Sequence, residues 1–240
     1  MRKTIIRRAL AVLAMLTAST TVAFSQVEET GLHHVLKTKF IEGNVVFMSL
    51  VSLTLVLGLA FAIERIIYLT LSEINTHRFC DDMSRLVAEG NIDEARQLCR
   101  NTRGPVASIC YQGLLRIKEP LANIERSVSA YGTVQAALLE KGCSWIRLFI
   151  AMAPSLGFLG TVIGMVMAFD NIQMANDLSA AIVAEGMKVA LIMTVFGIIV
   201  ALILQLFYNY INNKIDRLVA QMEEASVVLT DAISAYKTLS

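Results

Sequence analysis

Charge is scarce in this sequence. Only 17% of the 240 residues are charged, and the formal net charge is +1. No stretch is strongly basic, which argues against the phosphate-neutralising surface that nucleic-acid binding requires. Hydrophobic residues make up 55% of the chain and the mean hydropathy is +0.60, well above what a soluble domain of this size needs for its core. The composition therefore predicts an integral membrane protein.

Side chains that carry chemistry are also few. The metal-binding types are four cysteines without CxxC spacing and three histidines without helical pairing: Cys80, Cys99, Cys110, Cys143, His33, His34 and His77. The sequence has no GxxxxGK[ST] or GxGxxG nucleotide motif and no credible Ser/His/Asp arrangement. We expect no enzyme activity, no metal site and no cofactor.

The N-terminus has the pattern of a secretory signal peptide. Basic residues at positions 2, 3, 7 and 8 precede an uncharged run, residues 9–24, which ends in small residues. The rival interpretation is a retained fourth span, but sixteen residues diluted by Thr and Ser are short for a hydrocarbon core about 30 Å thick. We expect a signal peptide over residues 1–25 and a periplasmic segment over residues 26–44.

Three later segments are long and apolar enough to cross a bilayer. The first, residues 45–71, begins with nineteen uncharged residues, and the other two, residues 148–169 and 189–211, are uncharged throughout. The predicted fold class is therefore an all-α membrane protein with three transmembrane helices.

The charges between the spans predict orientation. Residues 72–147 contain ten Lys and Arg, whereas residues 170–188 contain two Asp, one Glu and a single Lys. Basic connections stay in the cytoplasm. We therefore expect a cytoplasmic helical domain over residues 72–147, a periplasmic loop over residues 170–188, a periplasmic N-terminus and a cytoplasmic C-terminus.

Helical extensions are expected on the cytoplasmic side. Gly90-Asn91 and Arg103-Gly104-Pro105 predict breaks between helices. Residues 121–147 contain no proline and have only Gly132 and Gly142 as weak points, so they predict a helix that runs into the second span. In residues 212–240 and just before them, apolar residues recur at spacings of three and four: Ile211, Ile215, Leu218, Met222, Ala225, Leu229, Ala232 and Tyr236. This seam predicts that the third span continues as one long helix against a partner helix.

The second and third spans carry small and hydroxylated residues. Residues for close helix packing are Pro154, Gly157, Gly160, Gly164 and Gly197, and Gly160-x-x-x-Gly164 has the spacing at which membrane helices touch. Thr161 lies among these glycines, and Thr194 shares a stripe with Ala190, Gly197, Ala201 and Gln205. The alternative is that these threonines only bond their own helix and the small residues only pack.

Ionisable residues are missing from residues 45–63, 148–169 and 189–211. Proton and ion relays through membranes normally use such groups. Glu64 lies at the inner edge of the first span beside Arg65, where we expect an interfacial charge. The sequence by itself therefore offers no proton carrier.

Two of these segments resemble the hallmark spans of the MotA/TolQ/ExbB proton-channel family. They are Ala153 to Met165 followed by Phe169, and the run Ala184-x-Gly186-Met187-x-x-Ala190-Leu191-x-x-Thr194-x-x-Gly197 that ends in Tyr208-Asn209. MotA-like stators have four spans, so three spans favour ExbB or TolQ. The signal-like N-terminus is similar to the extended ExbB type.

The resemblance implies a homopentamer in the bacterial inner membrane around two helices of an ExbD-like single-span subunit. That partner would bring an aspartate beside the threonines that match Thr161 and Thr194, which would line the proton pathway. Proton flow would drive a TonB-like protein that energises outer-membrane import. The alternatives are a TolQ-like subunit of the Tol-Pal system and a non-conducting scaffold.

Two departures from the family pattern limit what the resemblance carries. Val189 stands where many members have a glutamate, and Glu185, four residues earlier, is about 180° from Thr194 around a helix. Glu185 and Gln205 are additional polar candidates for the pathway. Leu204 stands where the family often has proline, so we expect a straighter third span.

Overall fold

The computed structural model describes residues 40, 43, 45–175 and 180–239, and within this part the regular elements are all helices. The expected signal peptide and nearly all of residues 26–44 lie outside the described residues. In chain order the helices are α3 (Val45–Ser72), α4 (Thr76–Ala88), α5 (Ile92–Asn101), α6 (Pro105–Leu115), α7 (Leu121–Glu140), α8 (Cys143–Ala175) and α9 (Ala180–Leu239).

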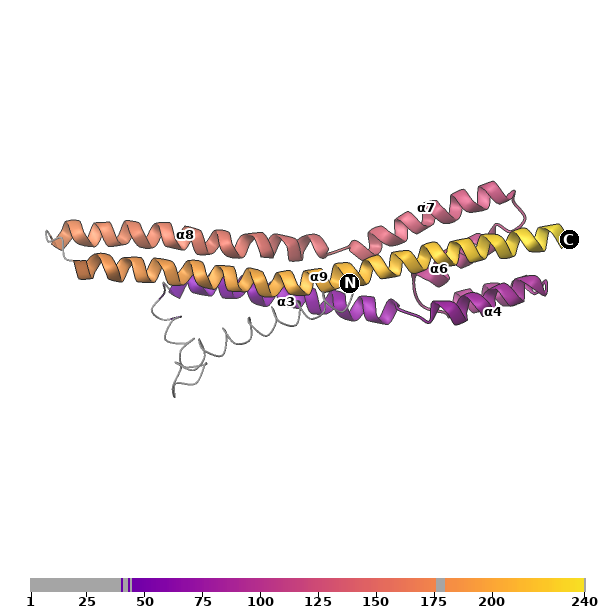
Figure 1. Ribbon diagram of the computed structural model, residues 1–240, viewed down its shortest axis with the longest axis horizontal. Coiled ribbons are helices and arrows are strands. Elements are labelled where there is room, and N and C mark those ends of the chain that lie inside the picture. The colour runs from indigo at the N-terminus through magenta and orange to yellow at the C-terminus, as the bar shows by residue number, and fades with distance from the viewer. Residues whose placement is uncertain (1–39, 41–42, 44, 176–179, 240) are drawn as a thin grey trace, which may run out of the picture.

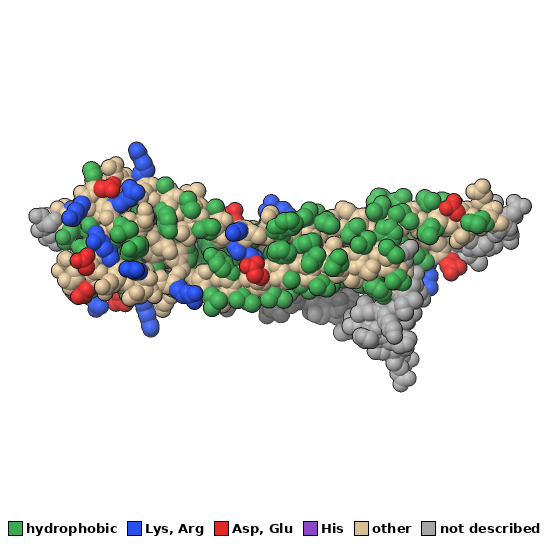
Figure 2. Space-filling model, turned by 180° about the vertical axis from the view of Figure 1, so that it is seen from behind, with side chains coloured by type: hydrophobic (Ala, Val, Ile, Leu, Met, Phe, Trp, Pro, Cys, Tyr) green, Lys and Arg blue, Asp and Glu red, His purple; other side chains and the backbone are tan. Residues whose placement is uncertain are grey.

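The molecule is a long rod built along α9. Helices α8 and α9 run side by side, α3 lies along the middle of α9, and α4 to α7 gather around its C-terminal half (Figure 1). Hydrophobic side chains cover the part formed by α3, α8 and α9, whereas Lys, Arg, Asp and Glu crowd the opposite end (Figure 2). Three helical stretches, Val45–Ala88, Leu121–Met174 and Val183–Thr238, are long and apolar enough to cross a membrane.

The predicted seam on α9 is the core of the half of the molecule that holds α4 to α7. Six of its residues are buried, namely Ile211, Ile215, Leu218, Met222, Ala225 and Leu229, and Ala232 and Tyr236 pack against the same core. The facing surfaces come from α4, α6 and α7 of the same chain. The prediction of one continuous helix is confirmed, and the partner for its seam is intramolecular.

Three glycines with positive φ mark where helices end. Gly90 (φ 81°) and Gly104 (φ 118°) separate α4, α5 and α6 as predicted. Gly142 (φ 87°) also ends a helix, so α7 and α8 are separate and the expected continuous helix from residue 121 into the second span is wrong. A left-handed residue cannot continue the helical hydrogen bonds, and glycine adopts that conformation without steric cost.

The connection between the second and third spans is mostly helical. Helix α8 continues to Ala175 and α9 begins at Ala180, whereas the sequence predicted a loop over residues 170–188. Continuing both helices keeps their backbone groups hydrogen-bonded, which explains why they extend past the apolar spans.

Helices α8 and α9 touch through two glycines. A Cβ atom on Gly157 would lie 2.9 Å from the carbonyl oxygen of Met193, and one on Gly197 would lie 2.6 Å from that of Ala153. The same substitution at Gly197 would meet the Cα atom of Gly157 at 3.2 Å. No side chain fits between the two backbones here, so this crossing fixes the register of the two helices.

Gly160 and Gly164 make room for a side chain and not for a neighbouring backbone. A Cβ atom on Gly160 would lie 2.8 Å from the sulfur of Met193, and one on Gly164 would lie 3.3 Å from its methyl carbon. Met193 is 1% exposed. Gly160 and Gly164 therefore form a recess for a methionine side chain, whereas the closest contact between backbones is at Gly157 and Gly197.

Three thiols, those of Cys80, Cys99 and Cys110, are buried in the core that α4, α5 and α6 form with α9. Burial raises the pKa of Cys80 to about 11, with smaller contributions from the charges of Glu224 and Asp81. Burial also raises the pKa of Cys99 to about 12 and raises the pKa of Cys110 further. The reactive form of cysteine is the thiolate, so these thiols are protected both sterically and chemically.

Alanine at the crossing glycines should destabilise the protein. Each of Gly157→Ala and Gly197→Ala forces a methyl group into backbone atoms, and overpacking of this kind costs about 1–3 kcal/mol. Thermal unfolding of the purified protein in detergent measures the effect. Gly132→Ala is the matched control, because a Cβ atom there meets nothing within 4 Å and alanine favours a helix by about 1 kcal/mol. Equal melting temperatures for all three variants would contradict the close crossing.

The buried thiols should resist alkylation. At pH 8 we expect Cys80, Cys99 and Cys110 to remain unlabelled by maleimide in the folded protein and to react fully after denaturation, because their raised pKa values keep them protonated. Mass spectrometry of digested protein measures each site. Ala130→Cys supplies an exposed thiol on α7 as the positive control. Labelling of Cys110 as fast as this control would show that the core around α4, α5 and α6 opens.

Candidate functional site

Two threonine hydroxyls meet between α8 and α9. The hydroxyls of Thr161 and Thr194 are hydrogen-bonded to one another, and that of Thr161 also lies 2.9 Å from the carbonyl oxygen of Ala190 and 3.1 Å from that of Gly157. Both side chains are half-buried. The pair lies about one helical turn from the Gly157–Gly197 contact, and that close crossing brings the two hydroxyls together.

The pair has more acceptors than hydrogens. Each hydroxyl carries one hydrogen and two lone pairs. When Thr161 donates to the Ala190 carbonyl, Thr194 can donate to Thr161, and when Thr161 donates to Thr194, the hydrogen of Thr194 is free for another acceptor. The two hydroxyls can therefore exchange donor and acceptor roles without moving a helix. If each threonine bonded only its own helix, Thr161 would contact the carbonyl of Gly157 but neither the carbonyl of Ala190 nor the hydroxyl of Thr194.

The threonines lie on the side of the α8–α9 seam that faces away from α3. Helix α3 covers the other side, where a Cβ atom on Gly58 would lie 2.7 Å from Leu204 and one on Gly160 would lie 3.4 Å from Phe47. At about 100° per residue, Thr161 is turned by about 100° around α8 from Gly160, and Thr194 is turned by about 80° around α9 from Leu204. In the part of the chain that the structure describes, α3 therefore covers one side of the seam and leaves the other side open.

The remaining predicted site residues lie around the pair at different distances along the helices. Pro154 is half-buried in α8 and has no N–H to donate to the carbonyl of Ile150. Gln205 is exposed and is turned by only about 20° from Thr194, three helical turns along α9. Glu185 is exposed and is turned to the opposite face of α9, so the structure does not bring it to the threonines.

Two buried cations join helices beyond the uncharged spans, and neither stood out from the sequence. Arg65, 5% exposed, donates to the carbonyl oxygens of Leu138 and Leu139 at the end of α7, at 3.3 and 2.5 Å. The sequence predicted an interfacial charge at Glu64, and Glu64 is exposed. The carbonyl of Leu138 also accepts from the N–H of Lys141, and the buried Nε of Arg65 has no hydrogen-bond partner in the part of the chain that the structure describes.

The second buried cation is Lys214 of α9, 6% exposed. Its ammonium donates to the hydroxyl of Thr70 at 2.8 Å and pairs with Glu73 at 3.1 Å, and Glu73 also lies 3.6 Å from Arg217. These contacts join α9 to the C-terminal end of α3. A long-range pairing of this kind leaves no periodic signal in the sequence.

A third cation lies on the open side of the seam. Arg147 of α8 donates to the hydroxyl of Tyr208 of α9 at 2.5 Å, and its guanidinium carbon is 5.5 Å from the centre of that ring. The arginine is exposed and the tyrosine is half-buried. In the sequence, Tyr208 stands out only as part of a motif, and nothing distinguishes Arg147.

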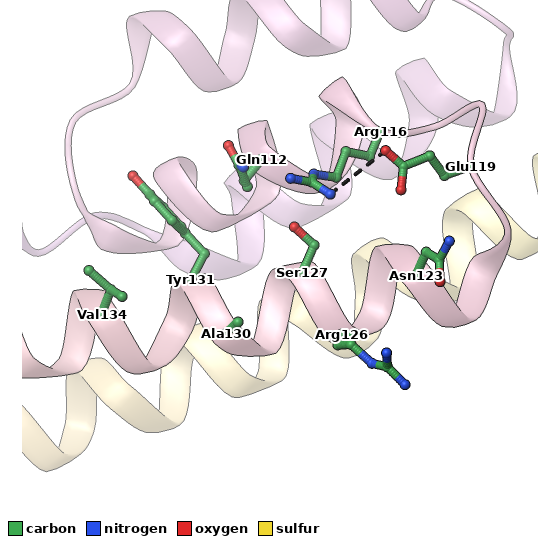
Figure 3. Close-up of a pocket in the computed structure, with 9 residues that line it drawn as sticks. All are labelled: Gln112, Arg116, Glu119, Asn123, Arg126, Ser127, Ala130, Tyr131 and Val134. Carbon is green, nitrogen blue, oxygen red and sulfur yellow. Dashed lines mark ion pairs between the residues drawn. The ribbon is translucent and has the colours of Figure 1, made fainter.

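Other parts of the described chain offer less chemistry. No group of three His, Cys, Asp or Glu side chains in the described residues could hold a metal ion. A hollow of about 540 Å³ lies between α6 and α7, away from the apolar spans (Figure 3). Its Arg116 and Glu119 pair with one another at 3.7 Å, and Arg126 points away from them. The threonine pair is therefore the main candidate site.

Several known proteins that are similar to this chain have ExbB in their names. A putative biopolymer transport protein ExbB homolog of Methanothermobacter thermautotrophicus is 30% identical over 167 residues, which is 69% of this chain and 59% of that protein. An ExbB-like 3 protein of Synechocystis is 24% identical, over 76% of this chain and 87% of its own length. The biopolymer transport protein ExbB of Neisseria gonorrhoeae is 35% identical, over 50% of this chain and 52% of its own.

The family comparison covers both helices that carry the threonine pair. The MotA/TolQ/ExbB proton channel family matches residues 101–224, just over half of the 240 residues. This range contains all of α8 and the membrane part of α9. The chain therefore belongs to the MotA/TolQ/ExbB proton channel family and is ExbB-like within it.

Proposed function

We propose that this chain is the ExbB-like subunit of an ion-motive complex in a bacterial inner membrane. It conducts protons together with an ExbD-like partner and passes the resulting work through a TonB-like protein to outer-membrane import. In this proposal five copies surround the partner helices, the N-terminus is periplasmic and the C-terminus is cytoplasmic. The membrane helices form the wall of the pathway, and the cytoplasmic helices hold that wall in register.

The observation that carries the proposal is the hydrogen-bonded pair of Thr161 and Thr194. It lies in two uncharged spans, on the side of the seam that α3 leaves open. Two hydroxyls that exchange donor and acceptor roles can solvate either the ionised or the neutral form of a nearby carboxyl group. They can therefore assist proton binding and release without carrying a charge themselves.

The titrating group is assigned to the partner. Residues 45–63, 148–169 and 189–211 contain no Asp, Glu, His, Lys or Arg, although such groups normally relay protons through membranes. An aspartate on an ExbD-like helix, placed beside the threonines, completes the site. Each elementary charge that crosses a potential of 100 mV releases about 2.3 kcal/mol, so several protons supply a large conformational change.

The names of the relatives favour import over envelope maintenance. The similar proteins carry ExbB names, which supports an ExbB-type role over a TolQ-type role for this chain. A neighbouring pair of ExbD-like and TonB-like genes is expected, and a neighbouring Tol-Pal set would instead assign the chain to envelope maintenance.

Removing either hydroxyl should impair conduction. We expect Thr161→Val and Thr194→Val each to reduce proton uptake at least tenfold in liposomes that contain the chain and its ExbD-like partner, measured with an internal pH dye. Valine has nearly the shape of threonine but cannot hydrogen-bond, so the loss reports the hydroxyl. Thr161→Ser keeps a hydroxyl and should retain most of the activity.

The matched control is Thr54→Val. Thr54 is a buried threonine of α3 whose hydroxyl bonds the carbonyl of Val51 in its own helix at 2.7 Å. This variant should conduct normally. Unimpaired proton uptake in the double variant Thr161→Val/Thr194→Val would overturn the channel role and favour a scaffold that holds partner helices without conducting.

A further inference from the structure

We propose that Arg147 and Tyr208 form a carboxylate-binding site at the cytoplasmic end of the open α8–α9 seam. Its ligand is an acidic side chain of the partner helix, about 21 Å toward the cytoplasm from the acid beside the threonines. This inference rests on the proposed function and specifies where the partner is anchored. It assigns a second contact, separate from the proton-carrying one.

The register of the two pairs supports a single surface. Arg147 precedes Thr161 by fourteen residues on α8, and Tyr208 follows Thr194 by fourteen residues on α9. Because the helices are antiparallel, both steps lead toward the same end of the molecule (Figure 1). Fourteen residues are close to four helical turns, so each member stays within about 40° of its threonine around the helix. One straight partner helix can therefore reach both pairs.

The geometry of Arg147 suits a carboxylate. Its guanidinium uses one N–H on the hydroxyl oxygen of Tyr208 and stacks near that ring, which holds the group in one orientation. The side chain is exposed, so its remaining donors are available, and the O–H of Tyr208 can donate to a second oxygen. A fixed guanidinium fork beside a phenol matches the two oxygens of a carboxylate.

The surroundings favour a helix as the carrier of that carboxylate. Large apolar side chains border the open side of the seam, with Phe158 65% exposed and Leu202 60% exposed. An apolar helix that carries two acidic side chains would complement this surface. Its apolar side chains would contact those that border the seam, one carboxyl group would lie at the threonines and the other, a carboxylate, at Arg147. A lipid phosphate would neutralise the charge of Arg147, but it would not also reach the threonine pair.

Retention of the partner in detergent tests the site. The tagged chain is co-expressed with its ExbD-like subunit, purified, and the partner bound per chain is quantified. We expect Arg147→Glu to lower retention at least tenfold, Tyr208→Phe to lower it less, and Arg147→Lys to keep most of it. Lys141→Gln is the matched control, because Lys141 is a neighbouring exposed cation on the α7–α8 link, off the seam. Should Arg147→Glu fail to fold, Arg147→Gln replaces it.

A charge swap identifies the ligand. Each Asp and Glu of the partner within about eleven to seventeen residues on the cytoplasmic side of its pore acid is changed to Lys and combined with Arg147→Glu. One such change should restore retention. Normal retention by Arg147→Glu overturns the proposal, as does a loss that no swap restores but that follows the phosphatidylglycerol content of nanodiscs. If the wild-type chain retains no partner, the proposed function itself fails.

Discussion

The close contact between the backbones of α8 and α9 is the constraint on which the rest of the structure depends. Gly157 and Gly197 leave no space for a side chain, so the two helices can meet there in only one register. That register brings Thr161 to Thr194 and, four turns away, Arg147 to Tyr208. A slip of one helical turn would separate both pairs, so the polar contacts follow from the packing of glycines.

Buried cations join the helices beyond the uncharged spans. Arg65 binds the end of α7, and Lys214 binds Thr70 and Glu73 at the end of α3. Burying an ion is expensive unless its hydrogen-bonding groups are satisfied. Lys214 has a hydroxyl and a carboxylate as partners, whereas Arg65 has two carbonyl oxygens and leaves its Nε without a partner among the described residues. The break at Gly142 would otherwise leave α8 loosely connected to the helix before it. Arg65 closes that break from a distant part of the chain.

Local patterns made much of this fold predictable. Uncharged runs predicted the three spans, and apolar residues at spacings of three and four predicted the long helix α9 with its buried seam. The sequence also shows that Thr161 lies among glycines and that Thr194 shares a stripe with small residues. Their hydrogen bond could not be predicted, because it depends on the register of α8 relative to α9. The recess of Gly160 and Gly164 for Met193 and the contact of Arg65 with Leu139 depend on residues far apart in sequence. Such contacts have no periodicity to detect, and the role of the threonines in a pore stays a prediction.

Helix α9 is long and uninterrupted. Its sixty residues run without interruption from Ala180 to Leu239, which corresponds to about 90 Å at 1.5 Å per residue. The threonine pair lies toward one end of this helix, and the core formed with α4, α6 and α7 lies toward the other. A tilt of about 5° around one end would displace the other by about 8 Å over that length. Angular changes too small to disturb the packing near the hydroxyls would thus become displacements of about one and a half helical pitches at the far tip.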